Sequence, residues 1–354
     1  MVKRELIGTD GRGNEVEAVT LGNANGTQAK ISTLGATLVS FIRKDKAGVM
    51  RDVVLGYDDP ASYIEHWDPH VGATVGRNAN RISKGKLKIN GVEYQLEINS
   101  GANNLHSGRN GVSHKIWEIE NVDETENSAV FKIFSADMEQ GFPGNMTIRV
   151  TFTLTEDDAL RISYEAVSDK DTFANFTNHS YFNLAGHDSG YVGSQKLKIY
   201  AKEFTPLSTP DSIPTGEIRS VAGTPYDFTE FKTIDQDIHE DYDQLNYTRG
   251  YDQNFLLEND GKLDIMAEAV SEETGIHLYA YTDCPGMQLY LANFLYEHTG
   301  KGGAVYGQRH AFCLESQYVP DAVNIDNPRF AVPLLKAGET YRSTTVYRLG
   351  LDKE

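Results

Sequence analysis

Hydrophobic and polar residues alternate along much of the chain, in the pattern of strands that bury one face. Over residues 146–154, Met, Ile, Val, Phe and Leu alternate with Thr and Arg, and the alternation resumes over residues 160–167 after the acidic stretch 156–158. Two runs with a period of two, separated by turn residues, are typical of a β-hairpin with one buried face. We therefore predict a hairpin over residues 146–167.

Similar runs recur throughout the chain, separated mostly by Gly, Asn, Asp or Pro. They occupy residues 28–44, 85–98, 129–136, 276–282, 287–295 and 341–349. One short helix is predicted in residues 58–67, with Asp59 as N-cap and Pro60 at the first helical position, and the charged segment 230–251 is predicted to be a loop. Many short strands with little helix indicate an all-β fold, a large antiparallel β-sandwich of curved sheets. Since no linker or repeat divides the sequence, we expect residues 1–354 to form a single domain.

The composition narrows the classes of function. The chain has 354 residues, 39% of them hydrophobic, and a formal net charge of −18, which disfavours nucleic acid and anionic membrane surfaces as partners. The start of the chain lacks the apolar run of a signal peptide, and no stretch approaches the length of a membrane span. We expect a cytoplasmic protein in which the two cysteines, Cys284 and Cys313, are free thiols.

Six short segments place hydrogen-bonding side chains where the strand pattern does not require them. They are residues 76–82, 103–108, 178–184, 250–255, 285–293 and 313–317. A single histidine such as His179 in "NHSYFNL" has an ordinary explanation as a hydrogen-bonded core residue. Glu315 is less easily explained, because a carboxylate in the apolar run "AFCLESQYV" should be paired or have a raised pKa.

Several kinds of chemistry lack the residues they need. No G-x-S-x-G motif offers a serine nucleophile, and no H-x-H or H-E-x-x-H spacing offers a metal site. The glycine-rich stretch "KGGAVYGQR" lacks the phosphate-binding signature and leads towards a strand. Proton transfer by His and Glu remains, with Asn, Arg, Asp and Gln available to bind hydroxyl groups.

The polar segments also carry a family resemblance. From "LGATLVSF" through "VGATVGRNANRI", "NNLHSG", "NHSYFNL", "PGMQLY" and "CLESQ" to "LKAGETYRSTTVYRL", nearly the whole chain resembles the aldose 1-epimerases, or galactose mutarotases. The resemblance implies a single-domain β-supersandwich with a sugar-binding cleft that needs neither a metal nor an organic cofactor.

The resemblance also implies roles for particular residues. His179 matches the family's general acid and Glu315 its general base. The matching substrate-binding positions are Asn80, Arg81, His106, Asp252 and Gln288. Ser107 stands where the family commonly has glycine, and Gln253 where it commonly has histidine. We expect these two departures to affect substrate preference more than the type of reaction.

The implied activity is the interconversion of the α and β anomers of free hexoses such as D-galactose and D-glucose, by a monomer or homodimer with a small monosaccharide as its partner. An acid at His179 must be protonated near neutral pH, and we expect the charges of Glu315 and Asp252 to favour that. The alternatives are a non-catalytic sugar sensor, a hexose-phosphate mutarotase, and a glycoside hydrolase using Asp252 as its second carboxylate.

Overall fold

The alternating pattern forms the expected hairpin. In the computed structural model, which describes residues 1–209 and 211–351, strand β13 (Met146–Leu154) pairs antiparallel with β14 (Ala159–Ser168). The apolar residues of β13 are buried, whereas the Thr and Arg residues between them are partly exposed. The prediction for residues 146–167 is confirmed, and the buried face of the hairpin joins the main hydrophobic core.

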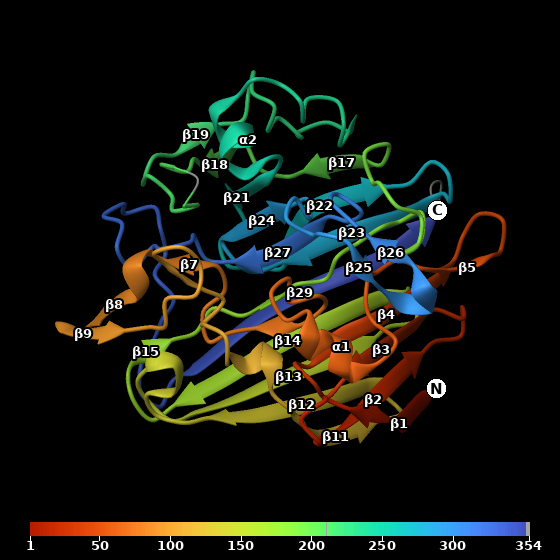
Figure 1. Cartoon of the computed structure of the whole chain (residues 1–354), viewed down its shortest axis with the longest axis horizontal. Helices are drawn as coiled ribbons and strands as arrows, with labels where there is room; N and C mark the ends of the chain where they lie inside the picture. Colours follow the sequence, from red (N-terminus) through yellow and green to blue (C-terminus); the bar gives the residue numbers. More distant parts are fainter. Residues whose placement is uncertain (210, 352–354) are drawn as a thin grey trace.

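The hairpin belongs to a nine-stranded sheet that runs across the molecule (Figure 1). In spatial order the strands are β11 (Glu118–Asp123), β12 (Ser128–Ser135), β13, β14, β29 (Thr340–Leu351), β23 (Ile276–Thr282), β22 (Asp264–Val270), β17 (Lys196–Ile199) and β20 (Lys232–Thr233). Strand β29 pairs antiparallel with β14 on one side and with β23 on the other. The middle of the sheet is therefore completed by a strand that is distant in sequence from both neighbours.

A five-stranded sheet packs against β29 and supplies one wall of the candidate site. Its strands are β19 (Arg219–Ser220), β18 (Glu203–Thr205), β21 (Asp252–Leu256), β24 (Gly286–Tyr290) and β27 (Cys313–Gln317). The Ser316 hydroxyl hydrogen-bonds with that of Thr345 on β29, and Leu314 joins the main core. Because successive side chains of a strand point to opposite faces, Glu315 points away from the large sheet.

A third sheet and several two-stranded pairs complete the strands. The third sheet consists of β1 (Val2–Thr9), β2 (Glu15–Gly22), β3 (Gln28–Ser32), β4 (Thr37–Lys44) and β5 (Met50–Asp52). The pairs are β6 (Thr74–Val75) with β16 (Thr177–Asn178), β7 (Arg81–Ile82) with β10 (Asn104–Leu105), β8 (Lys86–Ile89) with β9 (Val92–Gln95), β15 (Thr172–Phe173) with β28 (Leu334–Leu335), and β25 (His298–Thr299) with β26 (Val305–Tyr306).

Helical segments are short. They are α1 (Pro60–Glu65), α2 (Asp243–Thr248) and the 3-10 turns η1 (Ser83–Gly85), η2 (Val112–His114), η3 (Glu139–Gly141) and η4 (Lys301–Gly303). Helix α1 begins as predicted, because the Asp59 side chain accepts a hydrogen bond from the Ser62 amide at 3.1 Å. No helix among the described residues has the length and apolar character needed to cross a membrane.

Two segments differ from the predictions. Segment 230–251, expected to be a loop, contains β20 and α2, and Gln244 of α2 hydrogen-bonds with the backbone N–H and C=O of Leu207 at 2.6 and 3.1 Å. The run 287–295, expected to be one strand, leaves the sheet after Tyr290, and Ala292 has a left-handed φ of 48°. Contacts with distant segments accompany both differences, because in the second segment the backbone N–H of Leu291 donates to the carbonyl of Tyr251 at 3.1 Å.

All three sheets contribute to one core. The main hydrophobic cluster contains Val19 of β2, Phe152 of β13, Leu314 of β27 and Leu349 of β29. We propose that the chain is one domain, because within residues 1–209 and 211–351 no sheet has a separate core of comparable size. The two cysteines are buried free thiols, as expected.

Candidate active site

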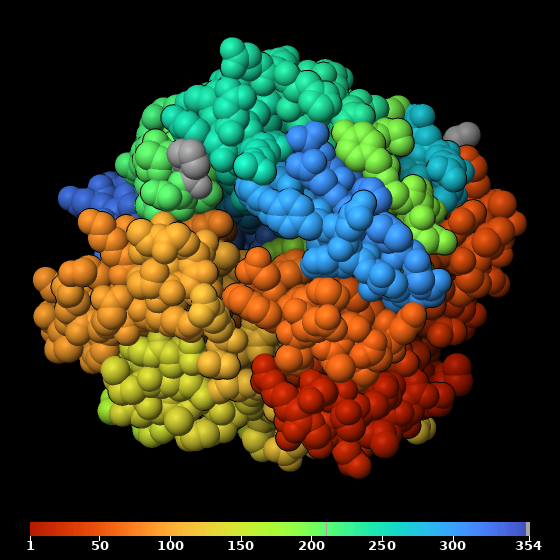
Figure 2. All heavy atoms as spheres, in the orientation of Figure 1, coloured from red at the N-terminus to blue at the C-terminus, as the bar shows by residue number. Residues whose placement is uncertain are grey.

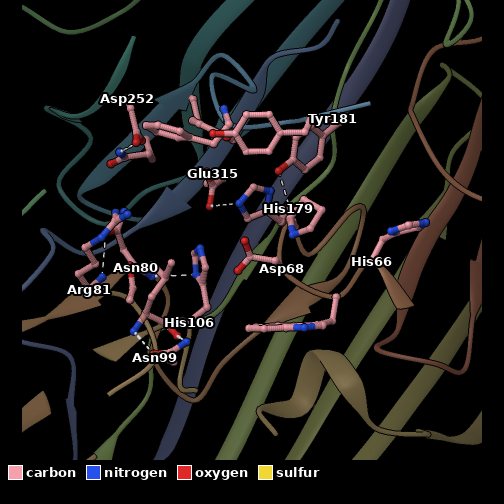
Figure 3. A pocket seen from close by; sticks show the side chains of 18 of the residues that line it. His66, Asp68, Asn80, Arg81, Asn99, His106, His179, Tyr181, Asp252 and Glu315 are labelled. Carbon is pink, nitrogen blue, oxygen red and sulfur yellow. Dashed lines mark hydrogen bonds and ion pairs between the residues drawn. The ribbon is translucent and has the colours of Figure 1, made fainter. Parts of the chain in front are cut away.

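The seven residues singled out in the sequence line one cavity of about 370 Å³. Figure 3 shows most of them converging from the two sides of this cavity. Asp252, Gln288 and Glu315 come from adjacent strands of the five-stranded sheet. The other four come from loops and short strands on the opposite side. In Figure 2 the surface is hollowed where the orange segment around residues 65–80 approaches the light-blue segment around residue 290.

Strand register sets the sheet side of the cavity. Gln288 of β24 lies directly opposite Glu315 of β27, and Asp252 of β21 lies opposite Tyr290 of β24. Residues 288 and 290 share one face of β24, so these side chains project from one face of the sheet. The Gln288 side-chain amide donates to the Asp252 carboxylate at 2.7 Å, which fixes the orientation of both groups.

A reciprocal pair of hydrogen bonds holds the loop side. The backbone N–H of Asn80 donates to Nδ1 of His106 at 3.1 Å, and the backbone N–H of His106 donates to the backbone carbonyl of Asn80 at 3.0 Å. Both residues have left-handed backbones, with φ of 62° and 50°, a conformation that costs energy for residues with a Cβ. The pair places Arg81, which follows Asn80, at the cavity wall.

This arrangement defines what His106 offers a ligand. Its Nδ1 accepts a hydrogen bond from the backbone N–H of Asn80, so we assign the proton of the neutral ring to Nε2. Burial, with smaller contributions from His179 and Arg81, lowers the pKa of His106 well below its ordinary value. His106 is therefore a neutral hydrogen-bond donor to the cavity.

His179 and Glu315 form a buried pair in the cavity (Figure 3). The Nε2 of His179 lies 3.4 Å from a carboxylate oxygen of Glu315, and their side chains are 6% and 3% exposed. Burial lowers the pKa of His179 to about 4. Burial raises the pKa of Glu315 well above its ordinary value, and the charge of Asp252 adds to that shift. The expectation that neighbouring carboxylates keep His179 protonated at neutral pH is wrong for the sugar-free site, because burial outweighs their attraction.

Among the described residues that line the cavity, Arg81 is the only Lys or Arg. Its positive charge opposes the rise in the pKa of both Asp252 and Glu315, although burial dominates and both values remain raised. Within the described chain its guanidinium has no hydrogen bond or ion pair, so its donors are available to the oxygens of a ligand.

The cavity contains a cluster with the composition of a metal site, but its donors do not suit a metal. Ligand atoms of His106, His179 and Glu315 lie within 4.8 Å of one another. A metal would need the lone pair on Nε2 of His106. That nitrogen carries the proton, because Nδ1 is occupied by the Asn80 amide. The cluster therefore supports proton transfer better than metal binding.

The two departures from the family pattern point away from the cavity. Ser107 has a left-handed φ of 67°, which explains why glycine suits this position, and its hydroxyl bonds to the backbone N–H and C=O of Asn78 at 2.8 and 3.1 Å. Gln253 lies on the opposite face of β21 and donates to the carbonyl of Gln244 in α2 at 3.3 Å. The expectation that these residues affect substrate preference is not supported, because both belong to the scaffold.

Sequence reasoning missed two groups of residues. Gln317 donates to Asn254 and Gln288 at 3.0 and 3.2 Å and accepts from Asn80 at 3.3 Å, so it joins the two sides of the cavity. Its position two residues after Glu315, on the same face of the strand, was the available signal. The second group lines the cavity and gave no comparable signal; it includes Trp67, Asp68, Asn99, Tyr181 and Tyr290.

The fold and site define a class: a β-sandwich protein with an acid–base pair buried in a polar cavity. Comparisons with known proteins agree with that class. The model of the family "Aldose 1-epimerase" matches residues 17–348. The human galactose mutarotase is 38% identical over 91% of this chain and 90% of its own length. The aldose 1-epimerase of Escherichia coli (strain K12) is 36% identical over 95% of this chain and 96% of its own length.

Solved structures give the same result. The crystal structure of an aldose epimerase homologue from C. elegans matches with a TM-score of 0.85 at 30% identity, covering 94% of this chain and 98% of the other. That of galactose 1-epimerase from Lactobacillus acidophilus NCFM also has a TM-score of 0.85, at 25% identity and 99% coverage of both chains. This chain belongs to the aldose 1-epimerase family, which confirms the resemblance found in the sequence.

Proposed function

We propose that this protein interconverts the α and β anomers of free hexoses, with D-galactose and D-glucose as substrates. The observation that carries the proposal is the buried contact between His179 and Glu315, 3.4 Å apart in a cavity lined by hydroxyl-binding groups. The family membership and the names of the human and bacterial relatives support the same reaction.

The geometry fits the atoms that must exchange protons. Glu315 removes the proton from the O1 hydroxyl while His179 delivers a proton to the ring oxygen O5. The C1–O5 bond breaks and C1 becomes an aldehyde. Rotation about C1–C2 then lets O5 attack the other face of C1, and the two groups return the protons. Because O1 and O5 are both bonded to C1, a base and an acid that lie side by side can reach both oxygens.

The pair carries a single shared proton through this cycle. In the sugar-free site burial favours the neutral forms, with the proton on Glu315. Bound sugar hydroxyls and the charge of Arg81 stabilise the Glu315 carboxylate, and the proton moves to His179. Arg81 and the Nε2–H of His106 then hydrogen-bond to sugar oxygens that gain negative charge.

Polarimetry with freshly dissolved α-D-galactose tests the proposal. The wild type should accelerate mutarotation above the spontaneous rate, and Glu315→Gln should reduce kcat by at least about a hundredfold, because the amide cannot accept the O1 proton. The control is Ser316→Ala, on the same strand but facing β29, which should retain kcat. Wild-type enzyme that binds galactose without accelerating the reaction would instead support a sugar sensor.

We propose in addition that the protein is cytoplasmic and acts as a monomer or homodimer. Two buried free thiols and no disulfide among the described residues suit a reducing compartment. All seven residues assigned to binding and catalysis lie in one cavity of a single chain, so we expect each copy to act independently. Light scattering combined with activity at increasing dilution checks the second point, since activity per chain should stay constant.

A further inference from the structure

Trp67 is a cavity residue with no role so far. It lies between α1 and β6 in the segment "HWDPH", is half-buried, and lines the same cavity as the catalytic pair. The chain has two tryptophans. The other, Trp117, is 1% exposed and donates its indole N–H to the carbonyl of Val112 at 2.9 Å, as a core tryptophan should. Trp67, by contrast, is only half-buried and lines the cavity, and the Arg109 guanidinium lies 6.0 Å from the centre of its ring.

A flat apolar ring in such a cavity suits a pyranose. A hexose in its chair form carries hydroxyl groups around its edge and C–H groups on its faces. The hydroxyl-binding groups here are Arg81, His106, Asp252 and Gln288, which can satisfy only the edge of the sugar. The C–H face needs an apolar partner, and an indole offers the largest one among the side chains.

A hydrogen-bonded series of three side chains, those of His114, Ser113 and His70, is attached to the backbone carbonyl of Trp67. The carbonyl of Trp67 can only accept, so the Nε2 of His114, 3.3 Å away, donates to it. The Nδ1 of neutral His114 then accepts from the Ser113 hydroxyl at 3.3 Å, and that hydroxyl accepts from Nδ1 of His70 at 3.1 Å. Burial keeps both histidines neutral by lowering their pKa values. Each of the three side-chain donors in this series therefore has one acceptor.

The same histidines pack against the indole and the catalytic side of the cavity. The rings of His114 and His70 meet the Trp67 ring edge-on, with centroids 5.8 and 6.4 Å away. The His70 ring also meets that of His106 at 4.9 Å. His70 therefore contacts both the indole and a group that faces the catalytic pair.

We propose that Trp67 stacks on the C–H face of the bound hexose, and that His114, Ser113 and His70 are positioning residues that hold the indole there. The inference rests on the proposed mutarotase function, since the sugar is its substrate. Stacking contributes to ground state and transition state alike, because the ring face does not react. Trp67 therefore sets KM and leaves kcat nearly unchanged.

Kinetics test the stacking residue. Trp67→Ala should raise the KM for galactose about tenfold, equivalent to about 1.4 kcal/mol, with kcat within about twofold of wild type. Trp67→Phe, which keeps an aromatic face, should raise KM less. The control is Phe134→Ala, which removes a 60% exposed aromatic ring outside the cavity and should change neither constant. An unchanged KM in Trp67→Ala overturns the proposal.

Tryptophan fluorescence gives a readout of binding without turnover. Galactose should change the emission of the wild type saturably, and the change should be lost in Trp67→Phe, because Trp117 is buried in the core. A change that persists in Trp67→Phe counts against the proposal. If the wild type fails to accelerate mutarotation but Trp67 still reports galactose binding, the proposed function fails while the stacking role survives.

A conservative replacement tests the positioning residues. His114→Ala removes the side-chain donor to the Trp67 carbonyl, leaving only the His70 backbone N–H at 3.1 Å, and should raise KM several-fold, with a weaker fluorescence response to sugar. His114→Gln restores an N–H donor at a similar distance and should recover most of the lost affinity. A merely structural role would affect kcat and KM together and would show no rescue by Gln. Equal KM values for Ala, Gln and wild type would overturn the positioning role.

Discussion

Burial sets the protonation of both Glu315 and His179, and it acts on them in opposite directions. It raises the pKa of the carboxyl group and lowers that of the imidazole to about 4, so both groups resist charge in the sugar-free site. Because the two groups are in contact, their titration belongs to the pair rather than to either residue, and in the proposed mechanism one proton moves between them. Sequence-based reasoning identified both residues but overestimated the attraction of neighbouring charges, since burial cannot be read from a linear motif.

The lowered pKa of His179 predicts that activity is lost only at an unusually low pH. Because its pKa is lowered to about 4, His179 stays neutral as the pH falls through 6.5, and the pair takes up a second proton only near pH 4. We expect kcat/KM to show no fall centred near pH 6.5 and to fall only towards pH 4, as measured by polarimetry with the spontaneous rate subtracted. A fall centred near 6.5, the value of an exposed histidine, would contradict the assignment.

Asp252 is expected to bind rather than to transfer protons. Its carboxylate is oriented by Gln288 and lies beside the other cavity groups. Asp252→Ala should raise KM about ten- to hundredfold, the effect of losing a hydrogen bond to a charged group, and should change kcat by less than about threefold. Steady-state polarimetry separates the two constants, with the exposed Asp264→Ala as control. A large selective loss of kcat would give Asp252 a catalytic role.

At the scale of elements, Arg77 joins segments that the sequence keeps apart. Its guanidinium donates to the side chain and carbonyl of Ser135 at 3.0 and 2.9 Å, to the carbonyl of Ala136 at 2.9 Å and to that of Pro143 at 3.0 Å. Arg77 is 2% exposed, and burial lowers its pKa to about 10. The loop that carries Asn80 is therefore anchored to the end of β12.

Removing this anchor should destabilise the protein strongly. Arg77→Met removes the guanidinium donor from the buried carbonyls of Ser135 and Pro143 and from the more exposed carbonyl of Ala136, and we expect the free energy of unfolding to fall by about 3 kcal/mol. Urea denaturation measures it. The matched control is Arg342→Met, whose side chain is 70% exposed and pairs with Glu165; it should change stability by less than about 0.5 kcal/mol. Similar effects of the two substitutions would mean that the buried network contributes little.

Local sequence patterns predicted those strands and helix ends that are determined by neighbouring residues. The hairpin 146–167 and the cap at Asp59 follow from side-chain alternation and from one carboxylate, and both are present. Helix α2 has no side-chain hydrogen bond at its N-cap, Tyr242. It is held instead by the hydrogen bond between Gln244 and Leu207, so its local sequence does not predict it. Trp67 was missed for the same reason, because only the folded loop brings it to the cavity.

For the whole molecule, charge should restrict the range of substrates. The net charge is −18, and the cavity lining contains Glu65, Asp68 and Asp252 with Arg81 as its one permanent cation. This field repels a phosphate group. We expect kcat/KM for glucose 6-phosphate to be at least about tenfold below that for glucose, and the gap to narrow as salt increases. Polarimetry with both sugars checks this; equal values, or a preference for the phosphate, would favour a hexose-phosphate mutarotase.

The position of β29 has a consequence for biosynthesis. Residues 340–351 fill the place between β14 and β23, so both of these strands leave the ribosome with an open edge and no partner on that side. Open edges pair with other chains, so the nascent polypeptide is exposed to edge-to-edge aggregation until β29 has been made. Ser316 of β27 bonds to Thr345 of β29, so the sheet that carries Glu315 gains this contact with the large sheet only once β29 is in place.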